Sequence, residues 1–132
     1  MAKNRQVFEE KLYHYTGLVL RVVDGDTLVV DFDFGRRLIE KSQSVRLARY
    51  NTAEPKDPDP LEAKKGKAAS AFFAKLVKAG DTVLIKTHKD AAEKFQRILA
   101  EVWVEPNQPS LNQQMLDSGH GKPWDGKGRK PT

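Results

Sequence analysis

The chain begins with three β-type segments in a row, and the first two are joined by Asp24-Gly25. Residues 13–23 alternate in character, and residues 27–34 resume the alternation of apolar and polar side chains. An Asp-Gly pair between two such runs is a strong signal for a hairpin turn. A third segment of this type spans residues 38–47. Three consecutive strands before any helix predict a small antiparallel sheet or barrel.

Helical patterns appear only after the third strand. Between residues 64 and 79, apolar side chains recur at three- and four-residue spacing opposite a lysine-rich face. Residues 81–88 and 97–104 are again β-type, and Ser110 with Gln113 forms a capping box that begins a short helix. This order of elements predicts a mainly β protein with α-helices (α+β), specifically a five-stranded OB-fold barrel with two flanking helices.

The 132 residues are enough for one domain with a single core. We expect a flexible N-terminal lead-in at residues 1–12, the folded domain at residues 13–119 and a basic extended tail at residues 120–132. Within the domain, loops are expected at residues 51–60, which contain three prolines, and at residues 88–94, which are charged.

Composition excludes several chemistries. The chain has no cysteine, so disulfides, zinc thiolate sites and thiol nucleophiles are ruled out. Its 39% hydrophobic and 31% charged residues are typical of a folded domain with a charged surface. No segment has the roughly 20 apolar residues of a membrane span, and the first residues lack the apolar core of a secretory signal. We therefore expect no membrane contact and a cytoplasmic location rather than secretion, and we take the protein to be a monomer.

The formal net charge is +5 and the isoelectric point is near 9.5. A basic surface favours polyanionic partners such as DNA or RNA, because lysines and arginines release counterions from a phosphate backbone. Many basic proteins bind no nucleic acid, so charge alone leaves both interpretations open.

Acidic residues occur where strands give way to turns or loops. Asp24 and Asp26 flank the first hairpin turn, and Glu54 lies in the loop after the third strand. Carboxylates at a strand end can hold a hard cation such as Ca²⁺ or Mg²⁺, with Asp26 the expected ligand and Asp24 a supporting or turn-forming residue. A hairpin turn that binds no metal is the alternative interpretation.

Two arginines lie on β-type segments. Arg46 is near the end of the third segment, and Arg97 opens the fifth. A planar guanidinium group can hold two phosphate oxygens at once. The alternative is a surface salt bridge, between Arg46 and Glu54 in the first case. If these groups meet, the site would suit phosphodiester hydrolysis, because a metal and fixed cations offset charge on the phosphoryl oxygens while a carboxylate orients or deprotonates water.

The remaining candidate residues contribute less to the functional prediction. The lysines of the first helix are expected to form a solvated face, and they are Lys64, Lys65, Lys67, Lys75 and Lys78. The three histidines are scattered and have no metal-ligand spacing. Phe95 and Trp124 could stack on bases, or they could serve as a loop anchor and as a side chain packed on the barrel.

Five segments in register resemble the staphylococcal nuclease (thermonuclease) family over roughly residues 16–126. They are VVDGDTLVV, VRLARYNTAEP, a lysine-rich helix with Ala-Phe-Phe, KFQRILAEVWV and LNQQMLDSGHGKPWDG. The resemblance implies an OB-fold barrel and a metal-dependent, sugar-nonspecific endonuclease that acts on DNA and RNA, with Ca²⁺ as its cofactor.

The resemblance also implies roles for particular residues. Ca²⁺ would be held by Asp26, Asn51 and the backbone carbonyl of Thr52. The catalytic residues would be Glu54, which activates or orients water, and Arg46 and Arg97, which bind the phosphate. Two competing interpretations remain: a nucleic-acid-binding OB module that has lost turnover, and an interaction or scaffold domain.

The chain departs from the family pattern at several positions. Asn51 stands where the best-known member has an aspartate, so one negative charge is missing, although an amide oxygen still binds a hard cation. We expect weaker metal affinity or a changed metal preference as a result. The proline of this loop follows Glu54 at Pro55, Gln96 stands in the place of a glycine, and a basic tail replaces the third helix.

Overall fold

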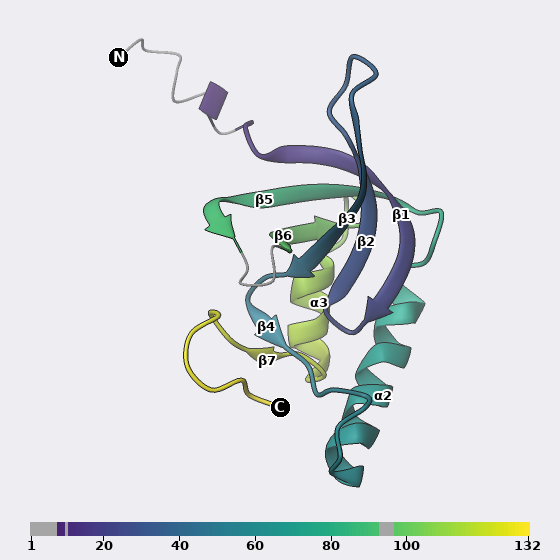
Figure 1. Ribbon diagram of the computed structural model, residues 1–132, viewed down its shortest axis with the longest axis vertical. Helices are drawn as coiled ribbons and strands as arrows, with labels where there is room; N and C mark the ends of the chain where they lie inside the picture. The colour runs from purple at the N-terminus through teal and green to yellow at the C-terminus, as the bar shows by residue number, and fades with distance from the viewer. Residues whose placement is uncertain (1–7, 10, 93–96) are drawn as a thin grey trace.

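Five strands form a closed barrel, with neighbours in the order β1-β2-β3-β6-β5 (Figure 1). The structure, a computed structural model, describes residues 8, 9, 11–92 and 97–132. The barrel strands are β1 His14–Asp24, β2 Thr27–Asp33, β3 Ile39–Leu47, β5 Thr82–Ala92 and β6 Ile98–Trp103. A five-stranded barrel accompanied by two helices confirms the expected OB-fold class.

Pairing around the barrel is antiparallel except between β3 and β6. Strand β1 pairs antiparallel with both β2 and β5, and the β2–β3 and β5–β6 pairs are also antiparallel. Strands β3 and β6 run parallel, with Val45 opposite Ile98 and Arg46 opposite Leu99. Because Arg97 immediately precedes β6, the parallel pair brings it beside the part of β3 that carries Arg46.

The barrel core is built from alternate strand residues, since successive side chains of a strand point to opposite faces. Leu28, Val30 and Phe32 of β2 are each at most 1% exposed. Phe34 lies on the same side, as its place in the alternating run predicts, and its ring stacks on that of Phe32 with 6.0 Å between the ring centres. Phe34 is nevertheless 45% exposed, because β2 ends one residue earlier, at Asp33, and the ring lies at the end of the core.

Helix α2, Pro60–Leu76, begins four residues before the expected position. Asp59 caps its N-terminus by accepting a hydrogen bond from the Leu61 N–H at 3.0 Å, and Pro60 fills a first-turn position that needs no N–H donor. One proline that indicated a loop therefore starts the helix. The helix ends at Leu76, and Gly80 lies in the turn that follows, with a φ of 94°.

Helix α3, Leu111–Ser118, begins at the expected N-cap residue, Ser110, but the second half of the expected capping box is not formed, because the Gln113 side chain contacts Arg49 and Asp117 instead. Ser110 accepts a hydrogen bond from the Gln113 N–H at 3.1 Å. Both helices pack on the barrel through buried apolar side chains, which include Phe73 of α2 and Met115 of α3. The five lysines of the first helical region are all exposed, as expected.

A second sheet of two strands joins β4, Tyr50–Asn51, to β7, Lys122–Pro123. The segment expected to be an extended tail therefore pairs, at its start, with the residues that follow β3. In Figure 1 this C-terminal segment, residues 122–132, curls back beside β4. The segment thus reaches the part of the molecule where several candidate site residues lie.

Strand β5 continues to Ala92, through most of the stretch expected to be a charged loop. The expected lead-in at residues 1–12 lies mostly outside the described residues, as do Phe95 and Gln96. No helix in the described ranges is long and apolar enough to cross a membrane.

Candidate active site

Asp26 is the acidic residue at the centre of the candidate site. It lies in the β1–β2 turn, where Asp24 Oδ1 accepts a hydrogen bond from the Asp26 N–H at 3.1 Å. The Asp26 residue is 5% exposed, and its two carboxylate oxygens accept hydrogen bonds from the hydroxyls of Thr27 (2.9 Å) and Thr52 (3.3 Å). A buried carboxylate is therefore held in place by hydroxyl groups from two segments.

Arg46 lies directly beside this carboxylate. Its Nη1 is 3.4 Å from Asp26 Oδ2, and the residue is only 5% exposed. Nη1 also donates to the Leu47 carbonyl at 2.8 Å, and Nη2 donates to the Tyr50 carbonyl at 3.1 Å. The partner of Arg46 is therefore Asp26, and the surface salt bridge with Glu54 that we considered is not formed. Backbone carbonyls fix the guanidinium group.

Asn51 and Thr52 complete the buried polar group, and each is 3% exposed. Asn51 Oδ1 accepts a hydrogen bond from Arg46 Nη2 at 3.1 Å. Asn51 Nδ2 donates to the Thr52 carbonyl at 3.1 Å and to the Pro131 carbonyl at 3.0 Å. These donor contacts fix the amide so that its oxygen, the atom that could bind a cation, faces Arg46.

Tyr50 and Gly25 tie these residues to the hairpin turn. Tyr50 is only 1% exposed, and its buried hydroxyl donates a hydrogen bond to the Gly25 carbonyl at 2.8 Å. A Cβ atom on Gly25 would lie 3.2 Å from the Thr52 side chain, so the absence of a side chain lets the two segments approach closely. Sequence reasoning did not find this anchor.

Glu54 lies at the edge of the buried group, and it is exposed. Its backbone packs against helix α2 at Gly66, where an added Cβ would lie 2.4 Å from the Glu54 carbonyl carbon. Its carbonyl also accepts a hydrogen bond from the Asp57 N–H at 3.2 Å. A position at the surface gives the carboxylate access to water, while the backbone that carries it is held.

The pKa of Asp24 is raised by its burial and by the carboxylates around it. Burial is the largest cause that raises the pKa of its carboxyl to about 7, and the side-chain hydrogen bond and negative charge of Asp26 and the charge of Glu54 contribute in the same direction. The hydrogen bond from the Asp26 backbone N–H acts in the opposite direction. The side chains of Asp26 and Glu54 therefore both lie within electrostatic range of Asp24. A positive charge close to Asp24 would offset the repulsion from these two carboxylates.

Arg97 joins the same network through Thr27. Its Nη1 donates to Thr27 Oγ1 at 3.4 Å, and Thr27 in turn donates to Asp26. Arg46 and Arg97 thus both reach Asp26, one directly and one through a single hydroxyl. Thr27 was not singled out from the sequence, although its position next to Asp26 at a strand start was a usable signal.

Trp124 of the C-terminal segment lies over Arg46. The Arg46 Cζ atom is 5.9 Å from the centre of the Trp124 ring system, and Lys130 Nζ is 5.6 Å from it. Both distances are within the range of a cation–π contact. Together with the Pro131 contact to Asn51, they place the C-terminal segment across one side of the site. No sequence signal predicted the Pro131 contact.

The oxygen donors of the site suit a hard cation in type. The Asp26 carboxylate, the Asn51 amide oxygen and the Thr52 oxygens are all hard ligands, the kind that Ca²⁺ and Mg²⁺ prefer. Among the described residues, no three His, Cys, Asp or Glu side chains form a group that could hold a metal ion. A cation would therefore depend on the amide and on Thr52 for the ligands that carboxylates do not supply.

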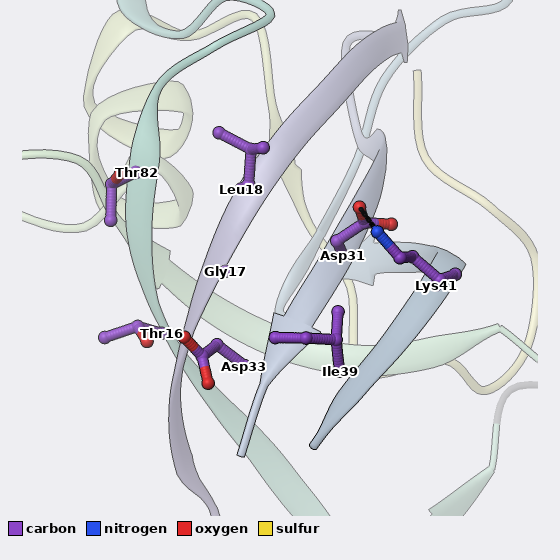
Figure 2. A pocket seen from close by; sticks show the side chains of 8 residues that line it. All are labelled: Thr16, Gly17, Leu18, Asp31, Asp33, Ile39, Lys41 and Thr82. Carbon is purple, nitrogen blue, oxygen red and sulfur yellow. Dashed lines mark hydrogen bonds and ion pairs between the residues drawn. The ribbon is translucent and has the colours of Figure 1, made fainter. Parts of the chain in front are cut away.

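A hollow at the other end of the β1–β2 hairpin contains none of these residues (Figure 2). It has a volume of about 270 Å³. Its two carboxylates already have partners, since Asp31 lies 3.5 Å from Lys41 Nζ and Asp33 accepts a hydrogen bond from the Gly35 N–H. The polar network at Asp26 is thus the stronger candidate site.

The fold and the site define an OB-type barrel with a buried carboxylate flanked by two arginines. Residues 44–125 match the model of the family described as "Staphylococcal nuclease homologue". The chain belongs to this family, which confirms the resemblance stated above. The match includes five of the six predicted site residues and begins after Asp26.

Three relatives show how far the similarity extends. The chain is 34% identical over 87 residues to "Thermonuclease" of Staphylococcus intermedius, which is 66% of this chain and 48% of that protein. It is 33% identical over 86 residues to "Thermonuclease" of Staphylococcus hyicus, which is 65% of this chain and 47% of that protein. It is 27% identical over 111 residues to "Endonuclease YhcR" of Bacillus subtilis, covering 80% and 9%. The chain therefore spans about half the length of the two thermonucleases.

Proposed function

We propose that the protein is a nuclease, and specifically a Ca²⁺-dependent endonuclease that hydrolyses phosphodiester bonds in both DNA and RNA. The observation that carries this proposal is the connected network in which Asp26 contacts Arg46 at 3.4 Å and reaches Arg97 through Thr27. The names of the relatives, two thermonucleases and an endonuclease, support the same reaction class.

The arginines would bind the phosphate and stabilise charge on it. The Leu47 and Tyr50 carbonyls fix the orientation of the Arg46 guanidinium group before a phosphate arrives. A guanidinium fork can donate to two phosphoryl oxygens at once. Arg46 and Arg97 would therefore stabilise the negative charge that develops on these oxygens in the transition state.

Asp26, Asn51 and Thr52 would hold the metal ion. When bound there, Ca²⁺ would supply positive charge close to the phosphoryl oxygens. The residues themselves provide one carboxylate and neutral oxygens, so the affinity is expected to be weaker than that of a site with a second carboxylate in place of Asn51.

Glu54 would orient the attacking water or accept its proton. The side chain is exposed and lies close enough to influence Asp24, while its backbone is held against Gly66 of helix α2. A general base must reach the water that it activates, and a fixed backbone helps to keep the carboxylate at that position.

Contacts to the phosphate rather than to base edges predict little sequence preference. None of the proposed contacts distinguishes ribose from deoxyribose, which supports activity on both nucleic acids. We further propose that the protein acts as a monomer and in the cytoplasm.

The direct test is incubation of supercoiled plasmid and of a single-stranded RNA with the protein and Ca²⁺, with and without a chelator. We expect nicking and then linearisation of the plasmid, loss of full-length RNA, and no cleavage when the chelator is present. Salt-dependent binding without cleavage in Ca²⁺, Mg²⁺ or Mn²⁺ would overturn the proposal and indicate a binding module.

A further inference from the structure

A hollow of about 470 Å³ opens beside the candidate site, on the outer face of β1, β2 and β3. Thr27 and Arg97 lie on its wall, and both also belong to the phosphate-binding network. The hollow then extends away from Asp26 along the strands, toward Arg21 and Ser44. It is therefore a continuation of the site rather than a separate pocket.

Irregular pairing in β1 shapes this hollow. The register between β1 and β2 shifts between Val19 and Arg21 and again between Val22 and Asp24. Neighbouring side chains in a regular strand point to opposite faces, and a bulge changes this direction. As a result the consecutive residues Leu20 and Arg21 both line the hollow.

A row of residues across the three strands forms the floor. Arg21 of β1 is opposite Val29 of β2, and Val29 is opposite Ser44 of β3. Adjacent strands are about 4.8 Å apart, so this row is about 10 Å across. Thr27, two residues from Val29 along β2, marks the end nearest Asp26. The floor is thus apolar in the middle and polar at its edges.

The hollow is lined by Arg21, by exposed apolar side chains and, at the end near the candidate site, by the Asp24 carboxyl group. Arg21 is exposed, and its guanidinium group forms no ion pair with the residues that the structure describes. Leu20 and Val23 are 37% and 46% exposed, so they present an apolar surface to solvent. A cation beside an exposed apolar surface suits a phosphate and the flat face of a base. The strand 2–3 face is also where OB-fold barrels commonly bind oligonucleotides.

We propose that this hollow is a second nucleotide subsite, which binds the nucleotide next to the scissile phosphodiester. The base lies over Leu20 and Val23, and Arg21 binds the phosphate on the far side of that nucleotide. The occupant is a single strand, because a base can cover this surface only when it is unpaired. This inference rests on the proposed function, since the subsite has a purpose only beside a bound phosphodiester.

Binding measurements test the role of Arg21. Arg21→Gln is compared with Arg36→Gln, a matched change at an exposed arginine between β2 and β3. The ligands are a fluorescent eight-nucleotide single-stranded DNA and a dinucleotide. Binding of both is measured in the presence of a chelator, so that no cleavage occurs. We expect Arg21→Gln to weaken binding of the longer strand about tenfold and to reduce its salt dependence by about 0.7 in slope, the value for one phosphate contact. Arg21→Gln should bind the dinucleotide as tightly as the parent protein does. Arg36→Gln should match the parent in both its affinity for the longer strand and the salt dependence of that binding.

A second variant tests the base contact. Val23→Ser removes apolar surface at an exposed position, so folding should be retained. It should weaken binding of the normal strand but not of a strand that lacks all its bases. Equal behaviour of Arg21→Gln and Arg36→Gln would overturn the subsite, and continued cleavage by these variants would show that the proposed function survives. A parent protein that binds no oligonucleotide would overturn both.

Discussion

Gly66 of helix α2 touches the backbone of Glu54 so closely that an added Cβ would lie 2.4 Å from the Glu54 carbonyl carbon and from the Pro55 nitrogen. Real Cβ atoms essentially never approach backbone this closely, so a side chain at Gly66 would have to move the loop or the helix. The helix thus sets the position of the residue that we propose orients water.

Gly66→Ala is predicted to reduce cleavage about tenfold or more and to lower stability. Alanine favours a helix over glycine by about 1 kcal/mol, but overpacking against rigid backbone costs about 1–3 kcal/mol. Cleavage rate and the urea midpoint would be compared with those of Lys67→Ala, at an exposed position of the same helix. A more stable and fully active Gly66→Ala protein would show that helix propensity outweighs the contact.

Arg46→Lys is predicted to reduce the cleavage rate about 10²- to 10³-fold, the usual effect of losing a preorganised donor. A lysine cannot keep the contacts to Leu47, Tyr50 and Asn51 while it binds a phosphate. Single-turnover rates of folded protein would be measured, with Arg49→Lys as the control. Arg49 forms an ion pair with Glu101 and is 43% exposed in its side chain, so its variant should cleave normally. Equal rates for the two variants would contradict the role of Arg46.

Asn51→Asp is predicted to bind Ca²⁺ about tenfold more tightly, because it adds a carboxylate to the proposed ligands. Titration calorimetry without nucleic acid measures this directly. The variant should be less stable than the parent in chelator, since the contacts from Asn51 Nδ2 to the Thr52 and Pro131 carbonyls are lost. Unchanged or weaker Ca²⁺ binding would remove Asn51 from the ligand set.

Asp24 predicts a pH dependence of stability in chelator. Its pKa is raised from 3.8 to about 7 in the folded protein, so the folded state holds this proton more tightly than the unfolded state. The stabilising contribution is complete below pH 3.8 and is lost as pH rises to about 7. Because the carboxyl has some solvent access, we expect a loss of only about 1–2 kcal/mol.

Asp24→Asn isolates this effect. The unfolding free energies of the variant and the parent would be measured with urea from pH 5 to pH 8. As pH rises, the variant should become more stable relative to the parent. A difference that stays constant with pH would show that Asp24 has an ordinary pKa.

Most of the candidate site could be predicted from the sequence because four of its six residues lie close together in the chain. Arg46, Asn51, Thr52 and Glu54 lie within nine residues, and Asp26 follows the strongest turn signal in the chain. The prediction was wrong about the start of helix α2, because a proline that breaks helix interiors is also favoured in the first turn.

The contacts of the C-terminal segment with the candidate site could not be predicted. Nothing in the local sequence indicates that Trp124 lies over Arg46 or that the Pro131 carbonyl meets Asn51. The pairing of β4 with β7 brings these residues together, and strands of two residues leave no periodic pattern.

The most direct test of the catalytic site is the single-turnover cleavage rate of Glu54→Gln in Ca²⁺, beside its affinity for a single-stranded oligonucleotide in chelator. Glu105→Gln, the same change at an exposed glutamate in another part of the chain, is the control. We predict that Glu54→Gln loses about 10²- to 10⁴-fold in rate while its affinity stays within about twofold of the parent, and that Glu105→Gln behaves like the parent. Full cleavage activity in Glu54→Gln would contradict the proposed mechanism.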